Sequence, residues 1–325
     1  MYYYNSFITR QKIKKKMFSV VFPGQGSQKV GMVRELYHKY DLVKKLINDA
    51  DQILETPIKK IIFDGPEHDL NLTENTQPAI FLASYSIFQV TKKEFGFNFK
   101  NAKHFAGHSL GEYTALACAN SISFEDALRI LKKRGKFMQE AIPNSEGGMI
   151  AVMGSNIKTI ETILNENKKN YECFIANDNS NQQVVVSGLI KDIEKFSEDL
   201  NLKKIKNIKL KVSAPFHCKL MKSASENMSK YILDLEMKEL ESPIVSNVTA
   251  RSTSTPQEIK KLLILQIEEK VRWVESINFM LKDGINKFIE IGPGKVLSGL
   301  IKRINRDTKI TSINNEEDMK ALAND

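Results

Sequence analysis

A G-x-S-x-G pattern, typical of an activated serine, occupies residues 107–111 with Ser109 at its centre. It follows an expected strand over 103–106 and precedes an expected helix over 110–120. A serine on such a turn exposes its hydroxyl above the sheet, and the amide of the next residue, at the helix N-terminus, can stabilise an oxyanion. The pattern predicts that Ser109 is a nucleophile assisted by the Leu110 amide. The alternative is that Ser109 only caps the helix.

A nucleophilic serine needs a base, and histidine is the usual one. The chain has five histidines. Four of them are poorly placed to act on Ser109. His38 lies in an expected helix, His68 in a polar loop and His104 at the start of an expected strand, and His108 directly precedes Ser109. This leaves His217 as the expected base, with a solvated surface histidine as the alternative. No acidic residue stands out as the group that orients its imidazole, so we consider a backbone or amide carbonyl instead.

The expected helix over 124–141 carries a positive charge on its apolar face. Its apolar stripe includes Ala127, Leu131 and Met138, and helical spacing puts Arg134 in the middle of that stripe. A guanidinium on a buried face needs an anion, because an unpaired buried charge is costly. The sequence leaves two interpretations open: a structural salt bridge, or a clamp for a substrate carboxylate.

Glycine loops and cysteines exclude several other kinds of site. The loop after the first expected strand, Pro23-Gly24-Gln25-Gly26, has Lys29 where a dinucleotide fingerprint needs its third glycine. The loop at 292–295 is interpreted as structural turn chemistry. Three scattered cysteines are too few for a disulfide framework or a zinc site and suit a reducing cytoplasm. We therefore expect no metal and no bound cofactor.

Strands and helices alternate through the first half of the chain, which favours a parallel sheet covered on both faces. Residues 146–213 then change to the order β-α-β-β-α-β of a ferredoxin-like unit. Later strands are expected at 244–247 and 287–291. The predicted class is α/β: a hydrolase-like large subdomain over 17–145 and 214–325, with an inserted ferredoxin-like small subdomain. Ligand clefts often form where two such lobes meet.

The 325 residues carry a net charge of +9, which raises the question of nucleic-acid binding. Most of the excess lies in two acid-free runs, +5 over residues 1–16 and +7 over 201–222, and the other residues sum to −3. The first run is expected to be a disordered extension. The second contains a single aromatic residue, Phe216, too few for a stacking surface for nucleic acid. The apolar stretches are too short to cross a membrane.

Five segments together resemble the malonyl-CoA:acyl-carrier-protein transacylases of bacterial fatty-acid synthesis. The resemblance extends from about Phe18 to Asn314 and is carried by FPGQGSQ at 22–28, GHSLGEYTAL at 107–116, RGKFMQEA at 134–141, FHC at 216–218 and EIGPGKVLSGL at 290–300. It implies malonyl transfer from malonyl-CoA to the phosphopantetheine thiol of an acyl-carrier protein through a malonyl-serine intermediate. Two alternatives remain, a serine hydrolase such as a thioesterase and a non-catalytic binding protein.

The resemblance also implies residue roles. Ser109 would attack the thioester and His217 would be the general base and then the general acid. The backbone amides of Gln25 and Leu110 would form the oxyanion hole, and Arg134 would bind the malonyl carboxylate. Gln266 matches the position whose main-chain carbonyl orients the histidine. Phe216 stands where some members have serine, and related malonyl-selective domains often have phenylalanine there.

The two basic runs suggest how anionic partners are attracted. CoA carries phosphates, and acyl-carrier proteins are typically acidic. We expect a basic rim near the lobe junction, formed by Lys209, Lys211, Lys302 and Arg303, to steer both partners toward Ser109. The expected protein is a cytoplasmic monomer.

Overall fold

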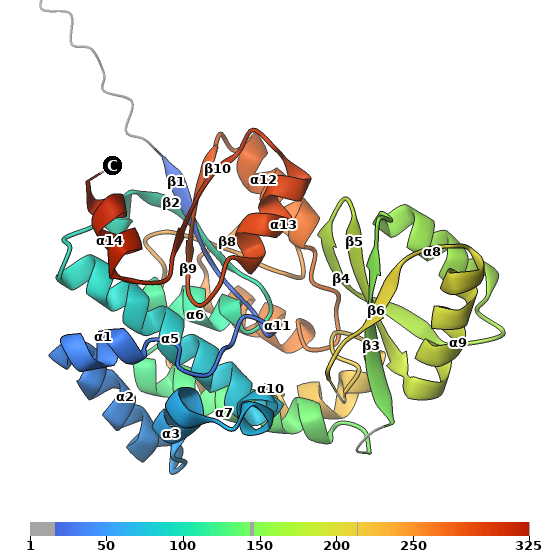
Figure 1. Cartoon of the computed structure of the whole chain (residues 1–325), viewed down its shortest axis with the longest axis horizontal. Helices are drawn as coiled ribbons and strands as arrows, with labels where there is room; N and C mark the ends of the chain where they lie inside the picture. Colours follow the sequence, from blue (N-terminus) through green and yellow to red (C-terminus); the bar gives the residue numbers. More distant parts are fainter. Residues whose placement is uncertain (1–16, 144–145, 213, 325) are drawn as a thin grey trace, which may run out of the picture.

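The computed structural model describes residues 17–143, 146–212 and 214–324, so the basic extension over 1–16 lies outside the described residues. Two separate sheets organise the fold (Figure 1). The large sheet contains β1 (Phe18–Phe22), β2 (Ala102–Gly107), β7 (Ile244–Val245), β8 (Ser252–Thr253), β9 (Lys287–Ile291) and β10 (Lys309–Ile313). The small sheet contains β3 (Gly147–Met153), β4 (Cys173–Ser180), β5 (Gln183–Leu189) and β6 (Asn207–Lys209).

The large sheet has the order β10-β9-β1-β2-β7-β8, and all its strands run parallel except β8. Alternate residues of β1 point to opposite faces, as strand geometry requires. Val20 and Phe22 join the main core, whereas Val21 packs into a second cluster with residues of α12 (Trp273–Lys282) and α13 (Val296–Ile304). Both faces of the central strand are therefore buried, which explains its uninterrupted apolar sequence.

Helices of the main core cover the other face of the large sheet. These are α1 (Arg34–Lys39), α2 (Asp41–Leu54), α3 (Ile58–Asp64), α4 (Glu67–Asn71), α5 (Thr73–Lys93), α6 (Gly111–Cys118), α7 (Phe124–Glu140), α10 (Lys222–Asp234) and α11 (Pro256–Leu265). The terminal helix α14 (Glu316–Ala323) follows β10. A short 3₁₀ turn precedes β2 at Phe99–Asn101, and another precedes α10 at Lys219–Met221.

The small sheet is antiparallel with the order β4-β5-β3-β6. With α8 (Ile157–Glu166) and α9 (Ile190–Leu202) it forms the lobe at the right of Figure 1. One face packs against these two helices, and the other contributes residues such as Met149 and Val185 to the main core. The order of elements is that of a ferredoxin-like unit, so the predicted fold class is confirmed. The boundaries at 145/146 and 213/214 stay a prediction.

Three elements differ from the sequence-based expectation in their ends. The sequence predicts a helix over 78–95, but α5 covers Thr73–Lys93 and holds Pro78 inside it. The strand expected over 205–212 is reduced to β6, which lies at the edge of the small sheet and is largely exposed. The strand expected over 244–247 ends at Val245, and Asn247, two residues later, forms hydrogen bonds with the serine turn.

Candidate active site

Ser109 lies on a tight turn between β2 and α6. Its φ of 54° is in the left-handed region, which is unusual for a residue with a side chain. The flanking glycines permit this turn, because a Cβ at Gly107 would lie 1.9 Å from the Gly111 carbonyl and a Cβ at Gly111 would lie 2.3 Å from the Phe22 oxygen. The close packing of β1, β2 and α6 therefore requires glycine at both positions and holds the serine where the predicted elbow places it.

The Ser109 hydroxyl contacts His217. The Ser109 Oγ and His217 Nε2 atoms are 2.8 Å apart, and His217 Nδ1 lies 2.8 Å from the main-chain oxygen of Gln266. A carbonyl oxygen can only accept, so Nδ1 carries the hydrogen and Nε2 is free to accept the proton of the serine. The geometry can therefore activate Ser109 without an acidic third residue.

Burial makes His217 a neutral base. The side chain is almost entirely buried, and this burial, together with the positive charge of Arg134, lowers the His217 pKa to about 3. Two of the other four histidines have hydrogen-bond partners of their own. His104 contacts Asp283 at 2.7 Å, and His108 Nε2 lies 2.8 Å from Asn179 Oδ1 on β4. The latter contact joins the serine turn to the small sheet.

Arg134 lies on the buried face of α7 and is 1% exposed. Its Nη1 donates to Gln77 Oε1 at 2.8 Å, and its Nη2 donates to Gln266 Oε1 at 2.9 Å and to Ser109 Oγ at 3.1 Å. Its Nε has no partner, and no carboxylate forms an ion pair with it, within the described residues. A buried guanidinium bound only to neutral groups beside the nucleophile can accept an anion.

The loop that holds Gln25 lies against the serine turn. A Cβ at Gly24 would be only 2.6 Å from the main-chain oxygen of His108, so the backbone of this loop approaches the turn closely. The Ser27 hydroxyl donates to the Gly24 oxygen and holds the loop in shape. Leu110 is the residue that precedes α6, where amides point toward the helix N-terminus. The oxyanion role of both amides stays a prediction.

Three polar residues that sequence reasoning missed complete the buried network. Asn247 accepts from the Ser109 amide with Oδ1 and donates to the Gly107 oxygen with Nδ2, both at 2.7 Å. Glu112 accepts from the Asn247 amide and from Gln266 Nε2, and Gln77 contacts Arg134. Asn247 follows the end of a parallel strand, where polar residues often form sites, and this signal was available in the sequence.

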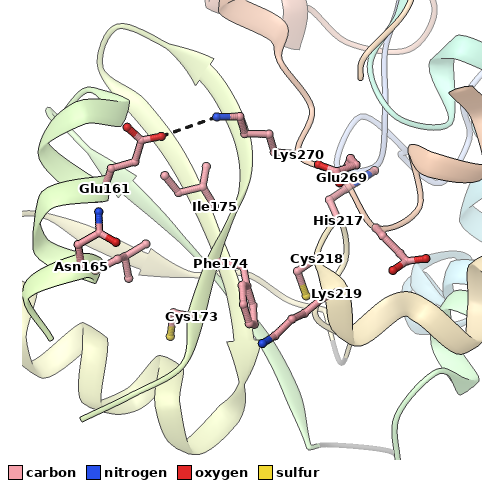
Figure 2. A pocket seen from close by; sticks show the side chains of 12 residues that line it. Glu161, Asn165, Cys173, Phe174, Ile175, His217, Cys218, Lys219, Glu269 and Lys270 are labelled. Carbon is pink, nitrogen blue, oxygen red and sulfur yellow. Dashed lines mark ion pairs between the residues drawn. The ribbon is translucent and has the colours of Figure 1, made fainter. Parts of the chain in front are cut away.

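A cleft of about 410 Å³ opens beside His217 between the lobes, as expected (Figure 2). The small lobe supplies β4 and α8, and Lys270 spans the cleft to Glu161, with 3.7 Å between Nζ and Oε1. Lys219 forms an ion pair with Glu172 and lies 5.0 Å above the Phe174 ring. Lys219 and Lys270 are thus cationic groups beside the base.

The four residues of the predicted basic rim are not in the lining of this cleft. Lys209 lies on the exposed edge strand β6, 3.4 Å from Glu194, and Lys211 follows it. Lys302 and Arg303 lie in the last turn of α13, where Lys302 donates to the Arg306 oxygen. Phe216 is buried in the main core next to the base. The roles of all five residues stay predictions.

Residues 17–143, 146–212 and 214–324 contain neither a cluster of metal-binding side chains nor a membrane-spanning helix. This part of the chain has no group of three or more His, Cys, Asp or Glu side chains arranged to hold a metal ion. It also has no helix that is both long and apolar enough to span a membrane.

Comparison with known proteins identifies the family. The model of the acyl transferase domain matches residues 19–320. The malonyl CoA-acyl carrier protein transacylases of Bacillus subtilis and Staphylococcus aureus are each 40% identical to the chain, over 91% and 93% of its length and 93% and 97% of theirs.

Solved structures agree with this result. The acyl-carrier-protein-S-malonyltransferase of Bartonella henselae superposes with a TM-score of 0.91 at 37% identity, covering 95% of this chain and 99% of its own. A malonyl-transacylase in complex with a type II polyketide acyl-carrier protein superposes with a TM-score of 0.90 at 35% identity, covering 95% of this chain and 100% of its own. The chain belongs to the acyl transferase family, among its malonyl-CoA:acyl-carrier-protein transacylases.

Proposed function

We propose that the protein transfers a malonyl group from malonyl-CoA to the phosphopantetheine thiol of an acyl-carrier protein, in fatty-acid synthesis. The observation that carries the proposal is the arrangement around Ser109. Its hydroxyl contacts a neutral histidine at 2.8 Å and a buried guanidinium at 3.1 Å that has no carboxylate ion pair within the described part of the chain. The first contact supports acyl transfer, and the second supports selection of an acyl group that carries its own carboxylate.

The first half-reaction loads the serine. His217 Nε2 takes the proton of Ser109 as Oγ attacks the thioester carbonyl. The amides of Gln25 and Leu110 stabilise the oxyanion. The C–S bond then breaks, and His217 donates its proton to the departing CoA thiolate. The Gln266 carbonyl keeps the proton on Nδ1 throughout. The product is a malonyl ester of Ser109 and free CoA thiol.

The second half-reaction reverses these steps with a different thiol. The phosphopantetheine thiol enters the emptied site, His217 removes its proton, and the resulting thiolate attacks the malonyl ester. The tetrahedral intermediate collapses, and His217 returns its proton to Ser109 Oγ. Arg134 holds the malonyl carboxylate in both halves, so the acyl group stays in place while the thiols exchange.

The reaction needs no cofactor, since Ser109, His217, the thioester and the phosphopantetheine thiol are all the reacting groups. We expect the protein to be a cytoplasmic monomer. Malonyl-CoA and an acidic carrier protein are both anionic. The exposed cations Lys209, Lys211, Lys302 and Arg303 raise the rate of their encounter, as Lys219 and Lys270 do beside the cleft.

The decisive assay incubates the protein with malonyl-CoA and phosphopantetheinylated acyl-carrier protein. Malonyl-carrier formed in step with the loss of malonyl-CoA supports the proposal. Free malonate as the main product, with the carrier left unacylated, would show a thioesterase instead. The same assay with apo carrier protein, which lacks the thiol, is the matched control and should give no acylated carrier.

A further inference from the structure

The buried carboxyl of Glu112 has no role in the acyl-transfer steps above. It lies in the first turn of α6 and is 1% exposed. Its Oε2 accepts two hydrogen bonds, from Gln266 Nε2 at 2.8 Å and from the Asn247 amide at 3.1 Å. Its Oε1 is buried and has no partner among the described residues. A buried carboxyl oxygen without a hydrogen bond destabilises the folded protein, so its presence calls for an explanation.

The amide of Gln266 connects this carboxyl to Arg134. Gln266 Oε1 accepts from Arg134 Nη2, while Gln266 Nε2 donates to Glu112 Oε2 and to the main-chain oxygen of Ser109. A guanidinium only donates and a carboxylate only accepts, so these two charges fix the orientation of the amide between them. Two hydrogen bonds, of 2.9 Å and 2.8 Å, and one amide group separate the two charges, which are therefore close enough to interact in a buried site.

Both protonation states of Glu112 fit the same hydrogen bonds. A proton can reside on Oε1, which has no donor pointing at it, while Oε2 keeps accepting from Gln266 and Asn247. Titration would therefore change the charge beside Arg134 without moving the side chains that hold Ser109 and His217. The hydrogen on Oε1 would have no acceptor among the described residues, and a glutamine at this position would leave two such buried hydrogens.

We propose that Glu112 takes up a proton when the malonyl carboxylate binds Arg134, so that the bound acyl carboxylate is the single negative charge beside the buried guanidinium. This inference rests on the proposed function. An acyl carboxylate seated on Arg134 brings a second anion near Glu112, and two buried anions that share one cation repel each other. A proton on Oε1 removes the repulsion.

Burial already raises the pKa of Glu112 into the range where the side chain can take up a proton near neutral pH. Desolvation raises its pKa to about 7, despite the hydrogen bonds from Asn247 and Gln266 and the charge of Arg134, which act in the opposite direction. A raised pKa means that the free protein loses this proton as the pH rises through about 7. A bound malonyl carboxylate raises the pKa further, so malonyl binding favours the protonated form.

The other ionisable groups around Glu112 do not change charge in the same range. Burial lowers the pKa of His217 to about 3 and also lowers that of His108, while it raises the pKa of Tyr113 to about 12. Burial lowers the pKa of Arg134 on α7, but a guanidinium remains protonated near neutral pH. Most charged groups on the other elements packed against α6 have partners of their own. On β2, Lys103 and His104 contact Asp283; on α7, Lys132 contacts Glu74 of α5, Arg129 contacts Glu125 and Lys136 contacts Glu140. Lys92 of α5 lies near Cys118.

The kinetic test follows acylation of the protein between pH 6 and 9 by the malonyl and acetyl thioesters of N-acetylcysteamine, which carry no phosphate. For the wild-type protein we expect kcat/KM for the malonyl thioester to fall on the order of 20-fold above pH 7, from Coulomb repulsion across the site. The acetyl profile should be flat. Glu112→Gln, which is neutral at every pH, should make the malonyl profile flat as well.

Asp178 supplies a matched control. It is a second buried carboxyl, whose pKa is raised to about 6 by desolvation, but its charged neighbours are Lys270, Glu275 and Glu161. Asp178→Asn should keep the malonyl-specific fall in kcat/KM. A fall that disappears in Asp178→Asn and persists in Glu112→Gln would overturn the assignment.

A direct proton count covers the case in which Glu112→Gln fails to fold. Ser109→Ala binds thioesters without reacting, and titration calorimetry in two buffers of different ionisation enthalpy measures proton uptake. At pH 7.5, the protein should take up about half a proton more when it binds malonyl-CoA than when it binds acetyl-CoA. Equal uptake, or parallel pH profiles for the two acyl groups, overturns the inference. If malonyl thioesters do not acylate wild-type Ser109 at all, the proposed function fails instead.

Discussion

Removing the Arg134 guanidinium should change which acyl group the protein transfers. Arg134→Ala deletes the group that faces Ser109 at 3.1 Å and leaves in place both partners of the 2.8 Å contact between Ser109 Oγ and His217 Nε2. Malonyl transfer loses an ion pair, whereas acetyl has no carboxylate and loses nothing. We therefore expect malonyl transfer to fall steeply and acetyl transfer to hold or rise.

The size of the effect follows from burial. Arg134 is 1% exposed, so its hydrogen bonds to a carboxylate form away from water. Hydrogen bonds to charged groups contribute about 1.5–3 kcal/mol each, and a bidentate pair therefore contributes about 3–6 kcal/mol. At about 1.4 kcal/mol per factor of ten, the ratio of malonyl to acetyl kcat/KM should fall by about 10²–10⁴.

The assay compares acylation by malonyl-CoA and acetyl-CoA for the wild-type protein and three variants. Arg129→Ala is the matched control, since Arg129 lies on the same helix but is exposed and pairs with Glu125. It should behave as wild type. Arg134→Lys keeps the charge without the forked geometry and should give an intermediate ratio. A folded Arg134→Ala protein whose malonyl-to-acetyl ratio stays within about threefold of wild type would refute the carboxylate contact.

Three further predictions concern the nucleophile, the turn and the rim. Ser109→Ala should abolish the malonyl adduct seen by intact mass, and Cys218→Ser should retain it, because burial raises the pKa of the Cys218 thiol and Sγ donates to a main-chain oxygen; an adduct that survives in Ser109→Ala would place the nucleophile elsewhere. Gly107→Ala should lower the free energy of unfolding by about 3 kcal/mol or more, since its Cβ would overlap the Gly111 carbonyl. Gly299→Ala, with no atom within 4 Å of the new Cβ and a helical position, should be neutral or stabilising in the same denaturant titration. Arg303→Glu should raise KM for the carrier protein more than KM for CoA at low salt, and equal changes for both would contradict a role in carrier docking.

The sequence by itself predicted the class of fold and the reacting groups. Local patterns were sufficient where one element decides the outcome. The glycines around Ser109 predict a tight turn, and helical spacing puts Arg134 on an apolar face. The change in the order of strands and helices after residue 146 predicts a second sheet, which the structure confirms. The ends of α5 and β6 were wrong by several residues, because element ends depend on packing and edge exposure rather than on periodicity.

The tertiary structure decided how these groups act together. The Ser109 amide is held by a residue 138 positions away, and the Arg134 guanidinium is held by Gln77 and by Gln266, which is 132 positions away. No local spacing encodes such contacts, because they arise only when strands and loops distant in the chain meet at one end of the sheet. The sequence could name a serine, a histidine and an arginine. Only folding shows that the arginine lacks a carboxylate ion pair within the described residues and that a buried glutamate lies one amide group away, because both facts depend on which polar groups remain when water is excluded.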